Sequence, residues 1–109
     1  MATRIAEQAF KSEATIRLGE YRGLVRSVTG PGRSGAIASV YASHLLGVPW
    51  IPAACDVPQE LEPVLVVDTA RQSGRTLRKM AKRLRAKYVV AIFNEPPRVI
   101  FWYEAAYGN

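Results

Sequence analysis

The sequence predicts an α/β fold, with a mostly parallel sheet of about four to five strands and flanking helices. Short apolar runs alternate with helical patterns along the chain, which is typical of a parallel sheet. The length of 109 residues and the mass of 12.0 kDa indicate a single domain, residues 1–109, with one modest core. The composition, with 49% hydrophobic and 22% charged residues, argues against a disordered chain, a fibre or a coiled coil.

The first third of the chain predicts a helix, a strand and a glycine-rich loop. Apolar residues recur at near-helical spacing over residues 3–14, so we expect a short helix there. Residues 24–28, Leu-Val-Arg-Ser-Val, predict a strand. This strand leads into residues 29–35, a loop that contains three glycines and one proline.

A second helix and a short extended segment follow the glycine-rich loop. The apolar face of this helix is expected to contain Ile37, Val40, Tyr41 and Leu45. Gly47 should end the helix, because glycine readily adopts the left-handed conformation found just after a helix. Residues 48–52 are expected to be extended, and residues 55–63 are expected to form a loop.

The second half of the chain predicts a strand, a helix and two more extended segments. Residues 64–67 are an uninterrupted apolar run, typical of a strand buried on both faces, and the run ends at Asp68. A basic helix over residues 75–87 follows. Its apolar stripe contains Leu77, Met80, Ala81 and Leu84. Residues 88–93 and 98–103 are expected to be the last two extended segments.

Residue counts exclude several kinds of site and indicate a location. One cysteine, Cys55, excludes an internal disulfide, and with one histidine it also excludes a zinc site built from Cys and His alone. The longest uncharged apolar stretch, residues 35–55, is interrupted at residues 47–49 and does not predict a membrane span. The N-terminus has no apolar signal region, so we expect a cytoplasmic protein without a membrane partner. A net charge of +6 favours polyanionic partners.

The most informative segment is one in which a strand ends at a carboxylate and a helix begins soon afterwards. Asp68 ends the strand, and the helix start carries Ser73, Gly74, Arg75 and Thr76. Small and hydroxylated residues at a helix start leave backbone N–H groups available to an anion, and the helix dipole adds positive charge. Because a carboxylate repels phosphate, Asp68 suits sugar hydroxyls or Mg²⁺. The pattern predicts a phosphate cradle, with an ordinary capped strand-to-helix connection as the alternative.

This segment resembles the phosphoribosyl-pyrophosphate (PRPP) signature of the type I phosphoribosyltransferases. That signature is an apolar strand, two adjacent acids, three variable residues and then Thr/Ser-Gly-x-Thr. Asp68 matches the first acid, and the phosphate loop is matched by Ser73, Gly74 and Thr76. Thr69 stands where the second acid is usual, so the sequence departs from the signature at this position.

Two further segments are similar to the same family. Residues 29–36 and the helix after them, followed by residues 45–49, look like the family's pyrophosphate loop, helix and second strand. Residues 99–104 are similar to the aromatic-plus-acid strand near the purine pocket of purine-type members. The likeness covers residues 20–104 and implies a phosphoribosyltransferase-like core without an evident hood, the part of the family that selects the base.

The resemblance implies a role for each of these motifs. Asp68 would be catalytic, and it would hold Mg²⁺ together with Glu104. The 5-phosphate of PRPP would bind Gln72, Ser73, Gly74, Arg75 and Thr76. The pyrophosphate would bind Gly32, Arg33, Ser34 and Gly35. The base would contact Trp102 and Tyr103, for which packing in the core is the alternative.

The function implied by the resemblance is Mg²⁺-dependent transfer of phosphoribose from PRPP to a nucleobase, with a purine favoured. A regulatory protein that binds PRPP or a nucleotide without catalysis is a second hypothesis, suggested by Thr69 and the missing hood. A less favoured third is a nucleic-acid-binding module, because eight cations and no acid lie between Thr69 and Asn94. Those cations could equally form a solvated face, and a homodimer is left open.

Overall fold

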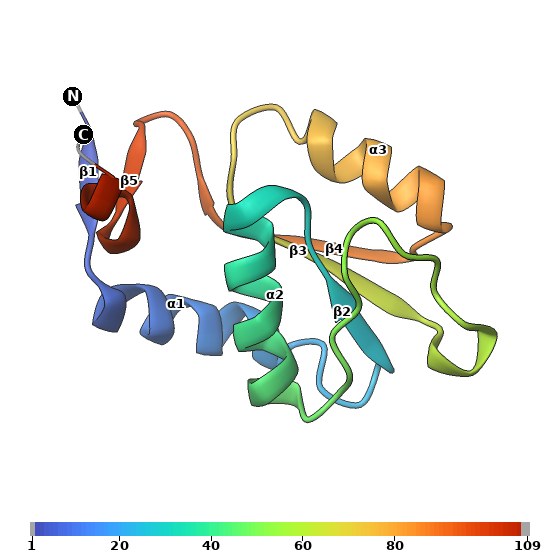
Figure 1. Cartoon of the computed structure of the whole chain (residues 1–109). Coiled ribbons are helices and arrows are strands. Elements are labelled where there is room, and N and C mark those ends of the chain that lie inside the picture. Colours follow the sequence, from blue (N-terminus) through green and yellow to red (C-terminus); the bar gives the residue numbers. More distant parts are fainter. Residues whose placement is uncertain (1, 108–109) are drawn as a thin grey trace.

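The computed structural model describes residues 2–107, and its central feature is a parallel three-stranded sheet (Figure 1). The sheet contains β2 (Ser27–Thr29), β3 (Val64–Arg71) and β4 (Tyr88–Asn94), in the order β2-β3-β4. Both strand pairs, β2–β3 and β3–β4, are parallel. The predicted α/β class with parallel strands is therefore confirmed.

Helices cover both faces of this sheet (Figure 1). Helices α1 (Glu7–Gly19) and α2 (Gly32–Leu46) pack on one face, and α3 (Arg75–Leu84) packs on the other. A single turn of 3₁₀ helix, η1 (Gln59–Leu61), lies in the connection between α2 and β3. In the part of the chain that the structure describes, no helix is long and apolar enough to cross a membrane.

Strand β3 is buried on both faces, as its uninterrupted apolar run predicted. Leu65 and Val67 belong to the core beneath α1 and α2, whereas Val66 packs with Leu77 and Met80 of α3. Successive side chains of a strand point to opposite faces, so one short apolar run contributes to both cores. The strand continues past Asp68 to Arg71, because β4 provides hydrogen-bond partners along this whole length.

The two ends of the chain meet in a second, smaller sheet that the sequence did not reveal (Figure 1). Here β1 (Thr3–Ile5) pairs in parallel with β5 (Val99–Phe101), and the 3₁₀ helix η2 (Trp102–Tyr107) follows. The prediction of a helix over residues 3–14 was therefore wrong at its start, since α1 begins only at Glu7. Local spacing cannot reveal a strand whose partner lies at the other end of the chain.

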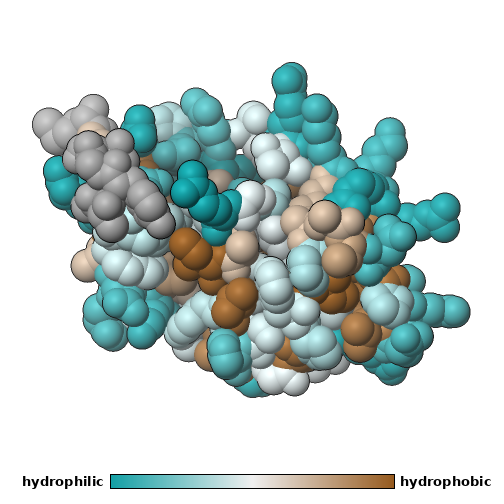
Figure 2. Space-filling view, in the orientation of Figure 1, coloured by the Kyte–Doolittle hydropathy of each residue, from teal (hydrophilic) through white to brown (hydrophobic). Residues whose placement is uncertain are grey.

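The buried face of α2 also differs from the predicted one. Ile37 and Val40 are 37% and 39% exposed, and the fully buried positions are occupied by Gly35, Ala38, Ser39 and Ala42. Helix α2 packs against the sheet and against α1 at the same time. Such close approach on two sides favours small side chains. Ile37 and Val40 therefore face solvent, where Figure 2 shows apolar side chains at the surface, whereas the predicted Tyr41 and Leu45 do pack partly against the core.

Two predicted segments are shorter in the structure than in the sequence pattern. Residues 48–52 contribute only one isolated bridge to the sheet, between Trp50 and Val28. Helix α3 ends at Leu84, because Arg85 adopts the left-handed conformation with φ of 55°. The sheet therefore has three full strands, and the predicted helix 75–87 loses its last turn.

Replacing Gly30 by alanine should lower the free energy of unfolding by about 1–3 kcal/mol or more. An added Cβ would lie 2.2 Å from the carbonyl oxygen of Gly35 and 2.3 Å from that of Val67, so the backbone would have to move. Gly19→Ala is the matched control, since nothing lies within 4 Å of a Cβ built there. Urea unfolding followed by circular dichroism compares the variants, and an unchanged stability of Gly30→Ala would contradict this close contact.

Candidate functional site

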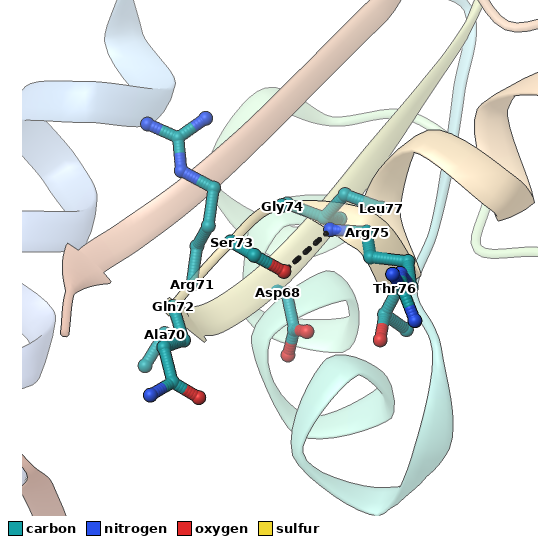
Figure 3. Close-up of a pocket in the computed structure, with 9 residues that line it drawn as sticks. All are labelled: Asp68, Ala70, Arg71, Gln72, Ser73, Gly74, Arg75, Thr76 and Leu77. Atoms are coloured by element: carbon teal, nitrogen blue, oxygen red, sulfur yellow. Dashed lines mark hydrogen bonds between the residues drawn. The ribbon is translucent and has the colours of Figure 1, made fainter.

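A polar cavity of about 160 Å³ lies where β3 ends and α3 begins (Figure 3). Its walls are the end of β3, the loop that follows and the first turn of α3. The lining residues are Asp68, Ala70, Arg71, Gln72, Ser73, Gly74, Arg75, Thr76 and Leu77. The structure thus brings Asp68 together with all five residues predicted to bind the 5-phosphate.

The backbone of this loop is shaped to present amide groups to the cavity. Gly74 has a φ of 80°, the left-handed conformation that glycine adopts without strain, and it lies directly before the helix. The first N–H group bonded within the helix is that of Arg78, which donates to the Gly74 carbonyl at 2.9 Å. The amides of Thr76 and Leu77 precede it, so they lack an acceptor within the helix and are placed for an anion.

Two side chains hold the loop in this conformation. The Ser73 hydroxyl oxygen accepts a hydrogen bond from the backbone N–H of Arg75 at 3.3 Å (Figure 3). Arg78 reaches back from α3 and donates from Nη1 to the Ser73 carbonyl at 2.8 Å. This role of Arg78 was not predicted, although its position five residues after Ser73 on a helix was the available signal.

Asp68 supplies the carboxylate of the site, and Figure 3 shows this group pointing into the cavity on the same side as the Thr76 hydroxyl. Burial raises the pKa of the Asp68 carboxyl above its ordinary value. The N–H and the hydroxyl of Thr69 oppose this effect and lower the pKa, the N–H by donating to Oδ1 at 2.8 Å. The raised pKa eases protonation, which reduces repulsion between Asp68 and a phosphate.

Thr69, the residue at the place of the usual second acid, contacts the Asp68 carboxylate but does not line the cavity. It is buried and faces the layer of α1 and α2, because adjacent strand residues point to opposite faces. There its hydroxyl interacts with the hydroxyl of Tyr103, which also exchanges a 2.8 Å hydrogen bond with the Ser34 hydroxyl. Burial is the main reason that the pKa of Tyr103 is raised. A polar chain thus connects the end of β3 with the start of α2.

The loop predicted to bind pyrophosphate lies at the same edge of the sheet. Gly30 and Gly35 are packed against each other so closely that neither has room for a side chain. Gly32 has a φ of 64° and lines a second hollow, which Thr76 of the first cavity also lines. Arg33 is exposed, whereas Ser34 turns inward to Tyr103. Of the four predicted residues, Gly32 therefore borders open space, and Gly35 is a packing position.

Trp102, Tyr103 and Glu104, predicted to bind the base or the metal, do not line the cavity at the end of β3. Trp102 packs against Phe10 with ring centroids 5.4 Å apart, and Tyr103 lies parallel to Phe101 at 5.6 Å. Glu104 accepts a hydrogen bond from the Phe101 N–H at 3.3 Å and lines a third hollow, which it shares with Gln72 of the first cavity. Base binding by these aromatic residues stays a prediction.

The donor set fits Mg²⁺ only as an ion shared with substrate phosphates. Asp68 offers one carboxylate to the first cavity, and Glu104 borders a different hollow. Over the described residues, no group of three or more His, Cys, Asp or Glu is placed to hold a metal. Mg²⁺ commonly binds through one or two carboxylates together with substrate phosphates, and Asp68 can supply that single carboxylate.

Sulfate should bind more tightly as the pH falls through the raised pKa of Asp68, because protonation removes the negative charge that faces the cavity. Sulfate keeps its charge in the mildly acidic range, so only the protein titrates. Asp68→Asn should bind sulfate with an affinity that changes little over this range. Calorimetric titrations at several pH values measure both proteins, and an equal pH dependence in Asp68→Asn would argue against this role.

Comparison with known proteins assigns the fold. No protein-family model and no curated protein matches the chain. The structure is similar to a purine phosphoribosyltransferase from Pyrococcus horikoshii Ot3, with a TM-score of 0.71 and 19% identity over 93% of each chain. It is also similar to the Helicobacter pylori xanthine-guanine-hypoxanthine phosphoribosyltransferase, with a TM-score of 0.77 and 16% identity over 98% of this chain and 95% of that one. The chain therefore has the fold of the type I phosphoribosyltransferases.

Proposed function

We propose that this chain is a cytoplasmic phosphoribosyltransferase that transfers phosphoribose from PRPP to a nucleobase, with a purine favoured. The observation that carries the proposal is the cavity at the end of β3, where Asp68 and the loop 72–76 meet. Its support is that this cavity occurs in a fold shared with two purine phosphoribosyltransferases. A homodimer stays an expectation.

The two loops would divide the substrate between them. The 5-phosphate would bind the amides at the start of α3 and the hydroxyls of Ser73 and Thr76. The pyrophosphate would bind at residues 32–35, where Gly32 borders the adjoining hollow. Because Thr76 lines both spaces, one ligand can reach from one loop to the other. Holding both ends of PRPP fixes the orientation of the bond that breaks.

Asp68 would act on the ribose between these two ends. As the bond from C1 to the pyrophosphate oxygen breaks, positive charge develops on the ribose, and the nearby carboxylate stabilises it. A ring nitrogen of the base then forms the new bond to C1, and the base loses a proton. Mg²⁺, held by Asp68 and the substrate phosphates, would supply charge neutralisation for the departing pyrophosphate.

The third hollow supports a nucleobase as acceptor. It has a volume of about 470 Å³ and adjoins the phosphate cavity through Gln72, which lines both. Glu95, Arg98 and Glu104 add hydrogen-bond acceptors and donors to its lining. The edges of a base carry both kinds of group, so a mixed polar hollow next to the ribose position suits this acceptor.

Pyrophosphate release from PRPP, measured with guanine, hypoxanthine, xanthine and adenine in turn, tests the activity. Release should depend on an accepted purine, and Asp68→Asn should slow it by about 100-fold or more, because the charge near C1 is lost. Glu60→Gln, the same chemical change at an exposed position of η1, should leave the rate unchanged. Base-dependent release that persists in Asp68→Asn would remove Asp68 from the proposed chemistry.

A second candidate function, binding of PRPP or a nucleotide without turnover, is favoured by the position of Thr69. The side chain is buried on the opposite face of β3 from Asp68, so the cavity holds one acid of the usual pair. Loss of a carboxylate near developing positive charge costs catalysis more than it costs binding, because it also reduces repulsion of a polyanion. Wild-type protein that binds PRPP in a calorimeter but releases no pyrophosphate would establish this function.

Thr69→Asp should lower the free energy of unfolding by about 3–5 kcal/mol without raising the rate of pyrophosphate release. The new carboxylate would be buried beside Tyr103 instead of facing the substrate. Thr69→Val, which keeps the shape and loses only the hydroxyl, is the control for packing. A Thr69→Asp protein that is as stable as wild type and more active would show that position 69 can serve the cavity.

A further inference from the structure

Helix α3 presents an exposed cationic surface that the proposed function does not need. The helix and the residues directly after it contain no aspartate or glutamate. Seven of the fifteen lysines and arginines of the chain lie here, and all seven are exposed: Arg75, Arg78, Lys79, Lys82, Arg83, Arg85 and Lys87. Figure 2 shows long hydrophilic side chains projecting where α3 lies in Figure 1. We call these seven residues the basic face.

The basic face lies on the side of α3 that points away from the sheet. Leu77 and Met80 are buried against the sheet, together with Val66 of β3 and Ala91 of β4. Successive residues of an α-helix are rotated by about 100°, so the five cations within α3 occupy one continuous arc of about 140° on the other side of the helix. No apolar side chain falls within this arc. The face therefore offers charge without an apolar contact surface.

Helix α1 shows how the same chain neutralises the cations of an ordinary solvated helix. Lys11 lies 3.2 Å from the carboxylate of Glu7, and Arg17 lies 2.7 Å from that of Glu13, each acid being four residues earlier. Over the residues that the structure describes, no cation of the basic face forms such an ion pair. A solvated surface does not require this separation of charge, so the basic face calls for another explanation.

The placement of these cations opposes the stability of the helix that carries them. Lys79 has Arg75 four residues before it and Arg83 four residues after it, and like charges at this spacing repel each other. Arg75 and Arg78 also lie in the first turn, where the helix dipole already adds positive charge. A polyanion lying along the face would relieve both effects.

The length and the charge density of the face suit a nucleic-acid backbone. Helix α3 has ten residues and so spans about 15 Å, a distance over which a duplex carries about nine phosphate charges. A membrane-bound helix also inserts apolar side chains, and an interface with an acidic protein is built around apolar or aromatic anchors. The apolar residues of α3 are used in the core. Phosphate contacts need only cations and hydrogen-bond donors, which the basic face supplies.

We propose that the basic face binds the sugar-phosphate backbone of nucleic acid, independently of base sequence. This surface is separate from the proposed substrate site, because Lys82, Arg85 and Lys87 line none of the three hollows described above. Backbone contacts carry no sequence information, which accounts for a site made of charge alone. Binding there depends neither on PRPP nor on turnover.

Fluorescence anisotropy with a labelled duplex DNA of 20 base pairs, in the absence of PRPP, tests the proposal. If five cations each neutralise one phosphate, the affinity of wild type should fall about 500-fold between 50 and 200 mM monovalent salt. Lys82→Ala should weaken binding about tenfold at 50 mM salt and flatten the slope of log K against log salt by about 0.9. Lys11→Ala, which removes the same charge from α1, should change the affinity by less than about twofold.

Lys82→Ala should fold normally, because it removes an exposed side chain and one source of repulsion within the helix. Circular dichroism and urea unfolding check this point, so that weaker binding reports on the surface. Equal losses in Lys82→Ala and Lys11→Ala would mean that net charge alone attracts DNA, and would overturn the proposal.

Absence of duplex binding by wild type at 50 mM salt would also overturn the proposal. So would equally tight binding of polyglutamate or of phosphatidylserine vesicles, since either would assign the face to another class of partner. Failure of the proposed function gives a different result. Lys82-dependent DNA binding without pyrophosphate release from PRPP would leave the basic face assigned and remove the transferase.

Discussion

The burial of β3 on both faces is the constraint on which the site depends. Leu65 and Val67 pack under α1 and α2, and Val66 packs under α3. A slip of one residue would exchange these two sets between the faces, so hydrophobic burial fixes the register strongly. The same register decides that Asp68 faces the cavity and that Thr69 faces away from it. The position of the acid is thus a consequence of core packing.

Close backbone contact then determines how the loop at residues 30–35 lies beside the loop at residues 72–76. Gly30 and Gly35 leave no space for a side chain, and the carbonyl of Val67 in the middle of β3 closes the other side of Gly30. This contact brings the start of α2 to the same sheet edge as the cradle. Tyr103 reinforces the arrangement, because its hydroxyl joins Ser34 on α2 with Thr69 on β3. The pairing of β1 with β5 holds the segment that carries Tyr103.

The basic residues between Thr69 and Asn94 have different surroundings in the folded structure. Arg71 donates to the Asn94 side chain at the end of β4, whereas Arg78 donates to the Ser73 carbonyl and so holds the backbone of the loop before α3. Lys79 and Arg83 border a hollow instead. A run of cations that looks uniform in the sequence therefore contains residues with different surroundings, and net charge alone would not separate them.

Local pattern in the sequence determined the parts of this protein that depend on near neighbours. The doubly buried strand at residues 64–67, Asp68 at its end and the glycine-containing loop at 73–76 follow from short local runs, and the structure brings the acid and the loop together in one cavity. Phosphate binding by this loop stays a prediction. Tertiary structure alone decided the pairing of β1 with β5, the small-residue face of α2 and the orientation of Thr69. Each depends on elements distant in the chain, because strand partners, helix crossings and strand register are set by packing that no local spacing records.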